Sequence, residues 1–145
     1  MIPPRMRSPI LAAAPVLAAL LAASAALPAR ASAQAAASPL YAAAQAEEGK
    51  KVFDASCAVC HGADLAGKDE APPVTGGYFA NSWGGHKVSE LLEFVQGNMP
   101  FTAPGSLSEE SYLHVVAYIL SRNGIPAGDA PLAKGDTGVI AVPKD

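Results

Sequence analysis

Two cysteines and a histidine lie within five residues of the chain, in the string CAVCH at positions 57–61. Residues three apart on a helical turn share a face, so the sulfurs of Cys57 and Cys60 can both bond to one edge of a flat prosthetic group. His61 can then meet a metal at the centre of that group, because a neutral imidazole nitrogen is a strong ligand. This is the motif that attaches haem c. It predicts one covalently bound haem with its iron.

Three other kinds of site also use a Cys-x-x-Cys pair. A thioredoxin-like dithiol needs a βαβ unit, for which the sequence has no pattern. A zinc site would draw on Cys57, Cys60, His61 and His86, whose spacing does not match known zinc sites. A local disulfide would leave His61 without a role. The haem site is the interpretation that uses all three residues of the motif.

The motif follows directly on a predicted helix over residues 42–58. Good helix formers and the apolar pair Val52 and Phe53 favour this helix. Gly49 in its middle costs about 1 kcal/mol relative to alanine. A glycine retained at such a place indicates close packing against another helix.

Two further helices are predicted after the motif. Apolar residues repeat at i, i+3, i+4 and i+7 from Val88, which indicates one face of a short helix. Ser108 is a good N-cap for the last helix, which Asn123 and Gly124 end. Residues 62–85 are rich in Gly and Pro without periodicity, and they predict an irregular loop. Aromatic residues make up only 6% of the chain, so the core is small and a large apolar cofactor would fill its centre.

Four strings occur in a characteristic order: CAVCHGADLAG, APPVTG, MPF and LSEESYLHVVAYILSRNG. On these strings, residues 42 to 124 resemble a class I c-type cytochrome. The resemblance implies an all-α cytochrome c fold, with three main helices and irregular loops around one haem. In that family a Met-Pro pair supplies the sixth iron ligand, which here is Met99. The same resemblance implies that Gly49 and Phe53 pack against Tyr118 where the first and last helices cross.

The resemblance also assigns residues around the haem. Pro72 is the proline whose carbonyl accepts the ring N–H of His61, with Pro73 as the alternative. Trp83 places its indole N–H near a haem propionate or, alternatively, is a plain core residue. His86 is read as an ordinary exposed residue just before the second helix, with iron ligation as its alternative role.

These assignments predict an electron carrier that is not an enzyme in its own right. An iron with both axial positions occupied binds no substrate, and a His/Met ligand pair raises the reduction potential. The alternative is an open-site haem protein that binds a gas or reduces peroxide. Gas-binding four-helix cytochromes generally carry the motif near the C-terminus, whereas here it lies early in the exported chain and Met99 fills the open position.

The first 33 residues have the pattern of a secretory signal. Arg5 and Arg7 form a positive start, residues 10–27 are rich in Ala and Leu, and Ala31-Ser32-Ala33 is a cleavage site. Cleavage predicts a periplasmic protein. The alternative is an uncleaved anchor facing the periplasm, because residues 10–27 just reach the length of a membrane span. The predicted parts are a signal peptide over 1–33, a flexible lead-in over 34–41, the cytochrome c domain over 42–126 and a C-terminal extension over 127–145.

Loss of the signal would remove three of the 10 basic residues and none of the 13 acidic ones, changing the net charge from −3 to −6. Such a charge argues against a nucleic-acid partner. Residues 104–128 and the region of Trp83 resemble the haem domains that accompany periplasmic quinoprotein (PQQ-dependent) dehydrogenases. The expected partners are therefore redox proteins, either such a dehydrogenase or a quinol-oxidising complex on one side and a terminal oxidase on the other.

Overall fold

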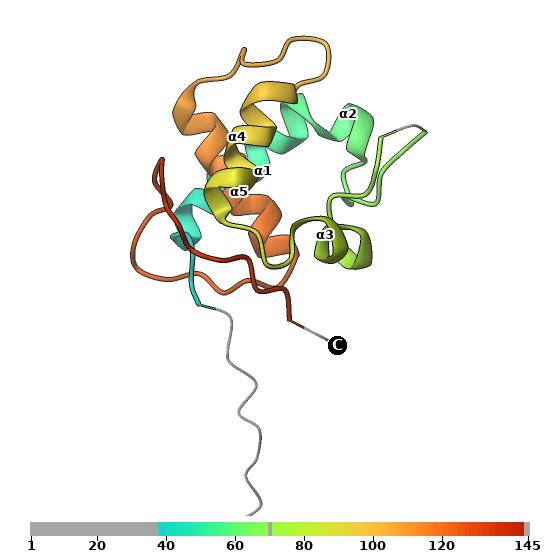
Figure 1. Ribbon diagram of the computed structural model, residues 1–145. Coiled ribbons are helices and arrows are strands. Elements are labelled where there is room, and N and C mark those ends of the chain that lie inside the picture. The colour runs from blue at the N-terminus through green and yellow to red at the C-terminus, as the bar shows by residue number, and fades with distance from the viewer. Residues whose placement is uncertain (1–37, 70, 144–145) are drawn as a thin grey trace, which may run out of the picture. The chain divides into compact units, whose positions relative to one another are not determined.

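The computed structural model describes residues 38–69 and 71–143, which form helices joined by loops (Figure 1). Within these ranges no strand occurs beyond isolated β-bridges. The helices are α1 (Ala43–Ser56), α2 (Ala58–His61), α3 (Gly76–Trp83), α4 (Val88–Asn98) and α5 (Glu109–Arg122). The expected all-α fold is confirmed, and α1, α4 and α5 are its three main helices. The predicted signal peptide and residues 34–37 lie outside the described ranges.

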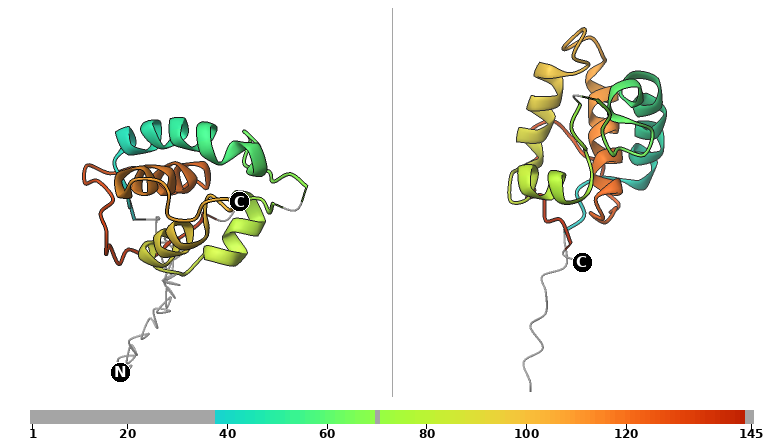
Figure 2. Two further views of the ribbon diagram at one scale, coloured as in Figure 1. Left: turned by 90° about the horizontal axis from the view of Figure 1, so that it is seen from above. Right: turned by 90° about the vertical axis from the view of Figure 1, so that its right-hand side faces the viewer.

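The most extensive helix packing joins α1 to α5, which lie side by side in Figure 2. Gly49 is the residue that allows this approach, because a Cβ there would overlap the backbone oxygen of His114 and lie 2.9 Å from the Cβ of Tyr118. One turn further along α1, the ring of Phe53 packs on that of Tyr118 at a centroid distance of 5.4 Å. The expected contact of Gly49 and Phe53 with Tyr118 is therefore present.

Gly49→Ala is expected to lower the free energy of unfolding. The added methyl group gains about 1 kcal/mol of helix propensity, but overpacking against backbone costs about 1–3 kcal/mol because the two helices must move apart. Urea unfolding measures the difference. Gly97→Ala is the matched control, since Gly97 lies in α4 and a Cβ there meets no atom within 4 Å. Equal unfolding midpoints for the two variants would contradict this account of the crossing.

The two later helices begin and end as their sequences indicate. The side chain of Ser108 caps α5 by accepting the N–H of Ser111 at 3.1 Å, and Asn123 follows the last helical residue. Four apolar residues of α4 at helical spacing are buried: Val88, Leu91, Leu92 and Val95. In the part of the chain that the structure describes, no helix is long and apolar enough to cross a membrane.

Helix α3 corrects one prediction, because it lies inside the stretch that was expected to be an irregular loop. Its first two residues are Gly76 and Gly77, which hide any helical pattern in the sequence. The end of α5 holds its start: the Asn123 side-chain oxygen accepts the N–H of Gly76 at 3.0 Å, and the Thr75 hydroxyl donates to the carbonyl of Arg122 at 3.2 Å. Contacts between residues 47 apart in the chain therefore place this helix.

Candidate haem-binding site

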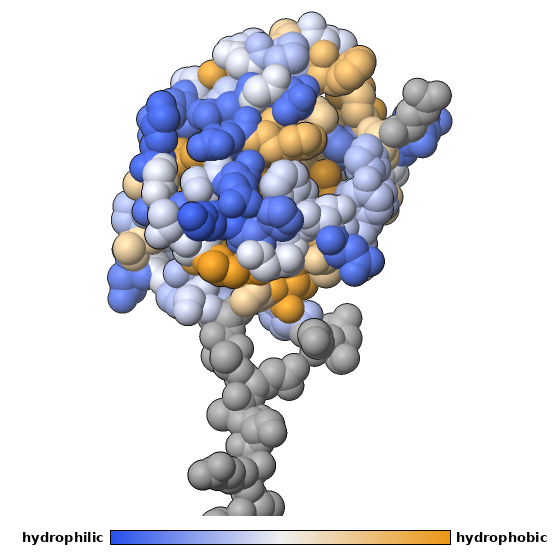
Figure 3. Space-filling view, viewed as in Figure 1, coloured by the Kyte–Doolittle hydropathy of each residue, from blue (hydrophilic) through white to orange (hydrophobic). Residues whose placement is uncertain are grey.

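A cavity of about 710 Å³ opens among the helices. Its volume lies in the range of pockets that hold cofactors, roughly 300–1,000 Å³. Apolar side chains dominate its walls. Figure 3 shows apolar residues among polar ones in the middle of one face of the molecule. All six residues predicted for the site line this one cavity: Cys57, Cys60, His61, Pro72, Trp83 and Met99. The fold thus gathers residues that are up to 42 positions apart in the sequence.

His61 is the last residue of α2 and is buried, with 9% of its surface exposed. Its Nδ1 lies 2.9 Å from the carbonyl oxygen of Pro72. A carbonyl can only accept a hydrogen bond, so Nδ1 carries the proton and donates it. The Nε2 lone pair is then free for a metal, and the hydrogen bond holds the plane of the ring. Of the two prolines considered, the contact is made by Pro72.

Cys57 and Cys60 are not joined in a disulfide, and both side chains line the cavity. Burial raises the pKa of Cys57 to about 11, and the neighbouring Cys60 adds to the rise. A redox-active Cys-x-x-Cys dithiol has the opposite property, a thiol pKa that is lowered. Within residues 38–69 and 71–143, no three His, Cys, Asp or Glu side chains are grouped as metal ligands. The Cys57 thiol therefore lacks the acidity of a dithiol oxidoreductase, and the described residues lack the grouping of a zinc site.

Met99 follows α4 directly and lies partly buried in the cavity wall. Two hydrogen bonds hold its backbone. Its N–H donates to the carbonyl of Val95 at 2.9 Å, and its carbonyl accepts the hydroxyl of Tyr112 at 2.7 Å. Tyr112 is 2% exposed, so α5 fixes the position of the Met99 loop from inside the core.

Sequence reasoning did not identify this role of Tyr112. The signal was present, because a tyrosine hydroxyl on a buried helix face needs a hydrogen-bond partner. The role of Asn123 was also missed. Its side-chain amide donates to the carbonyls of Val74 at 3.0 Å and of Ile119 at 2.8 Å. Asn123 thereby ties the segment after Pro72 to the end of α5.

Trp83 ends α3 and packs between two other rings. Its ring centroid lies 5.2 Å from that of Phe94 and 5.7 Å from that of His86. Trp83 and Phe94 line the cavity, whereas His86 does not. The Nδ1 of His86 instead lies 2.7 Å from a carboxylate oxygen of Glu90, and about half of the His86 side chain is exposed. The structure therefore does not bring His86 to the site.

Known proteins match this chain over its helical part. Residues 44–119, just over half of the chain, match the family model described as cytochrome C oxidase, cbb3-type, subunit III. The chain is 35% identical over 82 residues to a thiosulfate dehydrogenase of Stutzerimonas stutzeri (strain A1501), a match that covers 52% of this chain and 26% of that protein. It is 32% identical over 96 residues to the cbb3-type cytochrome c oxidase subunit CcoP of Rubrivivax gelatinosus, covering 64% and 32%.

The chain thus spans about a quarter to a third of the length of these two curated relatives. Among solved structures, the sulfane dehydrogenase SoxCD of Paracoccus pantotrophus is similar at a TM-score of 0.49 and 25% identity, over 74% of this chain and 61% of that one. The family match covers both the CAVCH motif and Met99, so the resemblance to a c-type cytochrome is confirmed. The chain belongs to the family of cbb3-type oxidase subunit III cytochrome c domains, which carry a covalent haem c and transfer electrons.

Proposed function

We propose that this chain is an exported one-electron carrier of the periplasm, with its haem attached through Cys57 and Cys60 and ligated by His61 and Met99. The observation that carries the proposal is the state of His61. Its Nδ1 proton is committed to the carbonyl of Pro72, so the nitrogen left for iron is Nε2. Met99 supplies a thioether sulfur to the same cavity.

Different residues of the chain would have different roles in holding the haem. The two cysteine sulfurs would hold the haem through thioether bonds, and the apolar walls would exclude water from it. Trp83 would offer its indole N–H to a propionate. Bound haem supplies an iron that alternates between the ferric and ferrous states, with a potential that the His/Met pair raises. His61 and Met99 would both hold the iron, which would leave no position at the metal for a substrate.

The relatives support a place between two redox proteins. One is named as a dehydrogenase and another as a subunit of an oxidase. We infer that the chain accepts electrons from a dehydrogenase, of which the PQQ-dependent class is one candidate, or from a quinol-oxidising complex. It passes them toward a terminal oxidase. By itself it acts as a carrier, whether free or as a subunit of a dehydrogenase complex.

A redox titration of the exported protein, followed by its haem absorption, tests this function. We expect one reversible step that fits a single electron, rapid oxidation of the reduced protein by ferricyanide, and no change of the reduced spectrum under carbon monoxide. The physical reason is that Met99 occupies the position that carbon monoxide needs. Carbon monoxide binding to the unmodified protein would reject the carrier and support the open-site alternative.

A further inference from the structure

The chain after α5 does not leave the fold but turns back along it, where it is seen in red in Figure 1. Residues 127–143, called here the C-terminal strap, bury two apolar side chains: Leu132 is 2% exposed and Ile140 is fully buried. Each of these residues marks an attachment of the strap to a different part of the fold.

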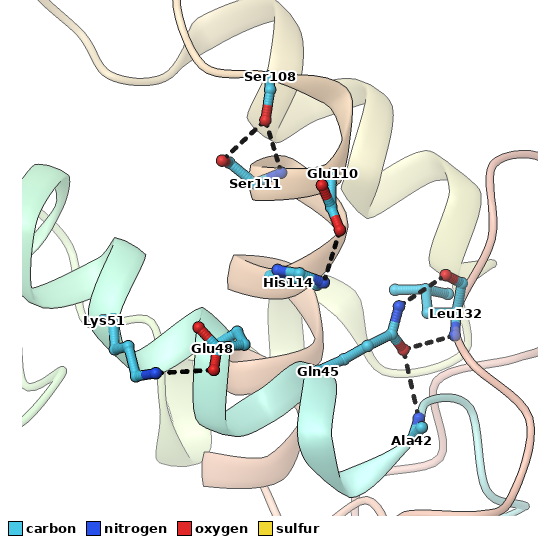
Figure 4. A network of polar contacts seen from close by, with 9 residues as sticks. All are labelled: Ala42, Gln45, Glu48, Lys51, Ser108, Glu110, Ser111, His114 and Leu132. Carbon is cyan, nitrogen blue, oxygen red and sulfur yellow. Dashed lines mark hydrogen bonds and ion pairs between the residues drawn. The ribbon is translucent and has the colours of Figure 1, made fainter.

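The first attachment is to α1, through the side chain of Gln45 (Figure 4). Its amide nitrogen donates to the carbonyl of Leu132 at 2.9 Å, and its oxygen accepts the N–H of Leu132 at 2.7 Å. Nearby, the N–H of Gly128 donates to the carbonyl of Tyr41 at 2.8 Å. This end of the strap is therefore bound to the helix that leads into Cys57.

The second attachment is to residues 85–88, which comprise the end of the α3–α4 connection and the first residue of α4. Three backbone hydrogen bonds form there: Gly85 N–H to the carbonyl of Ile140 at 2.8 Å, Ile140 N–H to the carbonyl of His86 at 2.9 Å, and Val88 N–H to the carbonyl of Gly138 at 2.8 Å. The strap thus pairs with the chain immediately after Trp83.

Apart from this pairing, the second half of α3 is held by side-chain packing, of Phe79 in the core and of Trp83 on Phe94. The extensive helix contacts of the described residues join α1 to α5, α4 to α5 and α1 to α2, and none of them includes α3. Asn123 holds only the start of α3. Trp83 is followed by Gly84 and Gly85, and Gly85 has a φ of 88°. Glycine adopts this and many other backbone conformations readily because it has no side chain, so these two residues do not themselves fix the chain after α3.

Trp83 and Phe94, in ring contact with each other, form part of the cavity wall on the α3–α4 side. The strap therefore joins the start of α1 to the α3–α4 connection. Each of these attachments lies outside the cavity but is continuous in the chain with residues that line it, Phe53 and Cys57 after the first and Trp83 before the second.

We infer that the C-terminal strap positions Trp83 against the haem, so that residues 138–140 act as a tuning element of the redox centre and not only as a cover for the core. The inference rests on the proposed function, because the haem must occupy the cavity. Release of residues 138–140 would let the end of α3 move outward and admit water beside the haem. A wetter haem has a lower reduction potential.

The test is Ile140→Ala in the full chain, loaded with haem. Trp83 is the single tryptophan of the sequence, so the emission that haem quenches at short range reports its distance from the ring. We expect a several-fold rise in tryptophan emission and a lower midpoint potential. Ile140→Val, which keeps most of the buried side chain, should restore both values.

Gln45→Ala is the matched control, because it releases Leu132 and leaves the pairing at residues 138–140 in place. It should lower the unfolding midpoint while emission and potential stay at the values of the unmodified chain. If Ile140→Ala changes stability alone, or if Gln45→Ala shifts emission and potential equally, the strap has no positioning role. Absence of haem absorption from the unmodified chain would instead reject the proposed function itself.

Discussion

Replacing Cys57 and Cys60 together with serine is expected to leave little folded protein in the periplasm. Serine forms no thioether bond, so the haem would no longer be held covalently. The apolar walls of the cavity, which include Phe53 and Phe79, would then face water. A small domain is stable by only about 5–15 kcal/mol, and this chain has few aromatic residues to build a core without the porphyrin.

Immunoblots of the periplasmic fraction, together with a stain for covalently bound haem, measure the outcome. The single variants Cys57→Ser and Cys60→Ser are the controls, since each keeps one sulfur and should accumulate to an intermediate level. If the double variant accumulates fully as a stable domain without haem, the fold does not depend on the cofactor.

Met99→Ala is expected to remove the weak long-wavelength absorption band of sulfur bonded to ferric iron. Met99 is the single methionine beyond residue 33, and no other thioether is available to replace it. The reduction potential should fall by a sizeable part of the roughly 0.8 V range that axial ligands control. The open position should also bind added cyanide in the ferric state and carbon monoxide in the ferrous state.

His86→Ala is the matched control, because His86 was the competing ligand and lies outside the cavity, paired with Glu90. It should leave the long-wavelength band, the signature of the sulfur ligand, unchanged. An unchanged spectrum in Met99→Ala together with an altered one in His86→Ala would overturn the ligand assignment.

The features that the sequence determined by itself are those whose physical cause is local. The spacing of CAVCH places two sulfurs on one helical turn whatever surrounds it. The repeat that begins at Val88 and the cap at Ser108 depend on residues three to seven positions apart, and the structure shows both helices. The bare glycine at position 49 indicated a close helix crossing, although only the family resemblance named Tyr118 as a partner.

Tertiary structure alone decided what depends on backbone groups and distant partners. A carbonyl has no signature in the sequence, so only the family resemblance named Pro72 ahead of Pro73, and the contact itself depends on where the chain brings that carbonyl to His61. Helix α3 has no periodic pattern and starts where Asn123, 47 residues away, binds its first N–H. In the sequence, Tyr112 and Ile140 look like ordinary core residues. Only the fold shows that Tyr112 binds the carbonyl of Met99 and that Ile140 pairs with the chain that follows α3. Side-chain periodicity records which residues are buried, but the hydrogen bonds that orient a site are set by the folded path of the backbone.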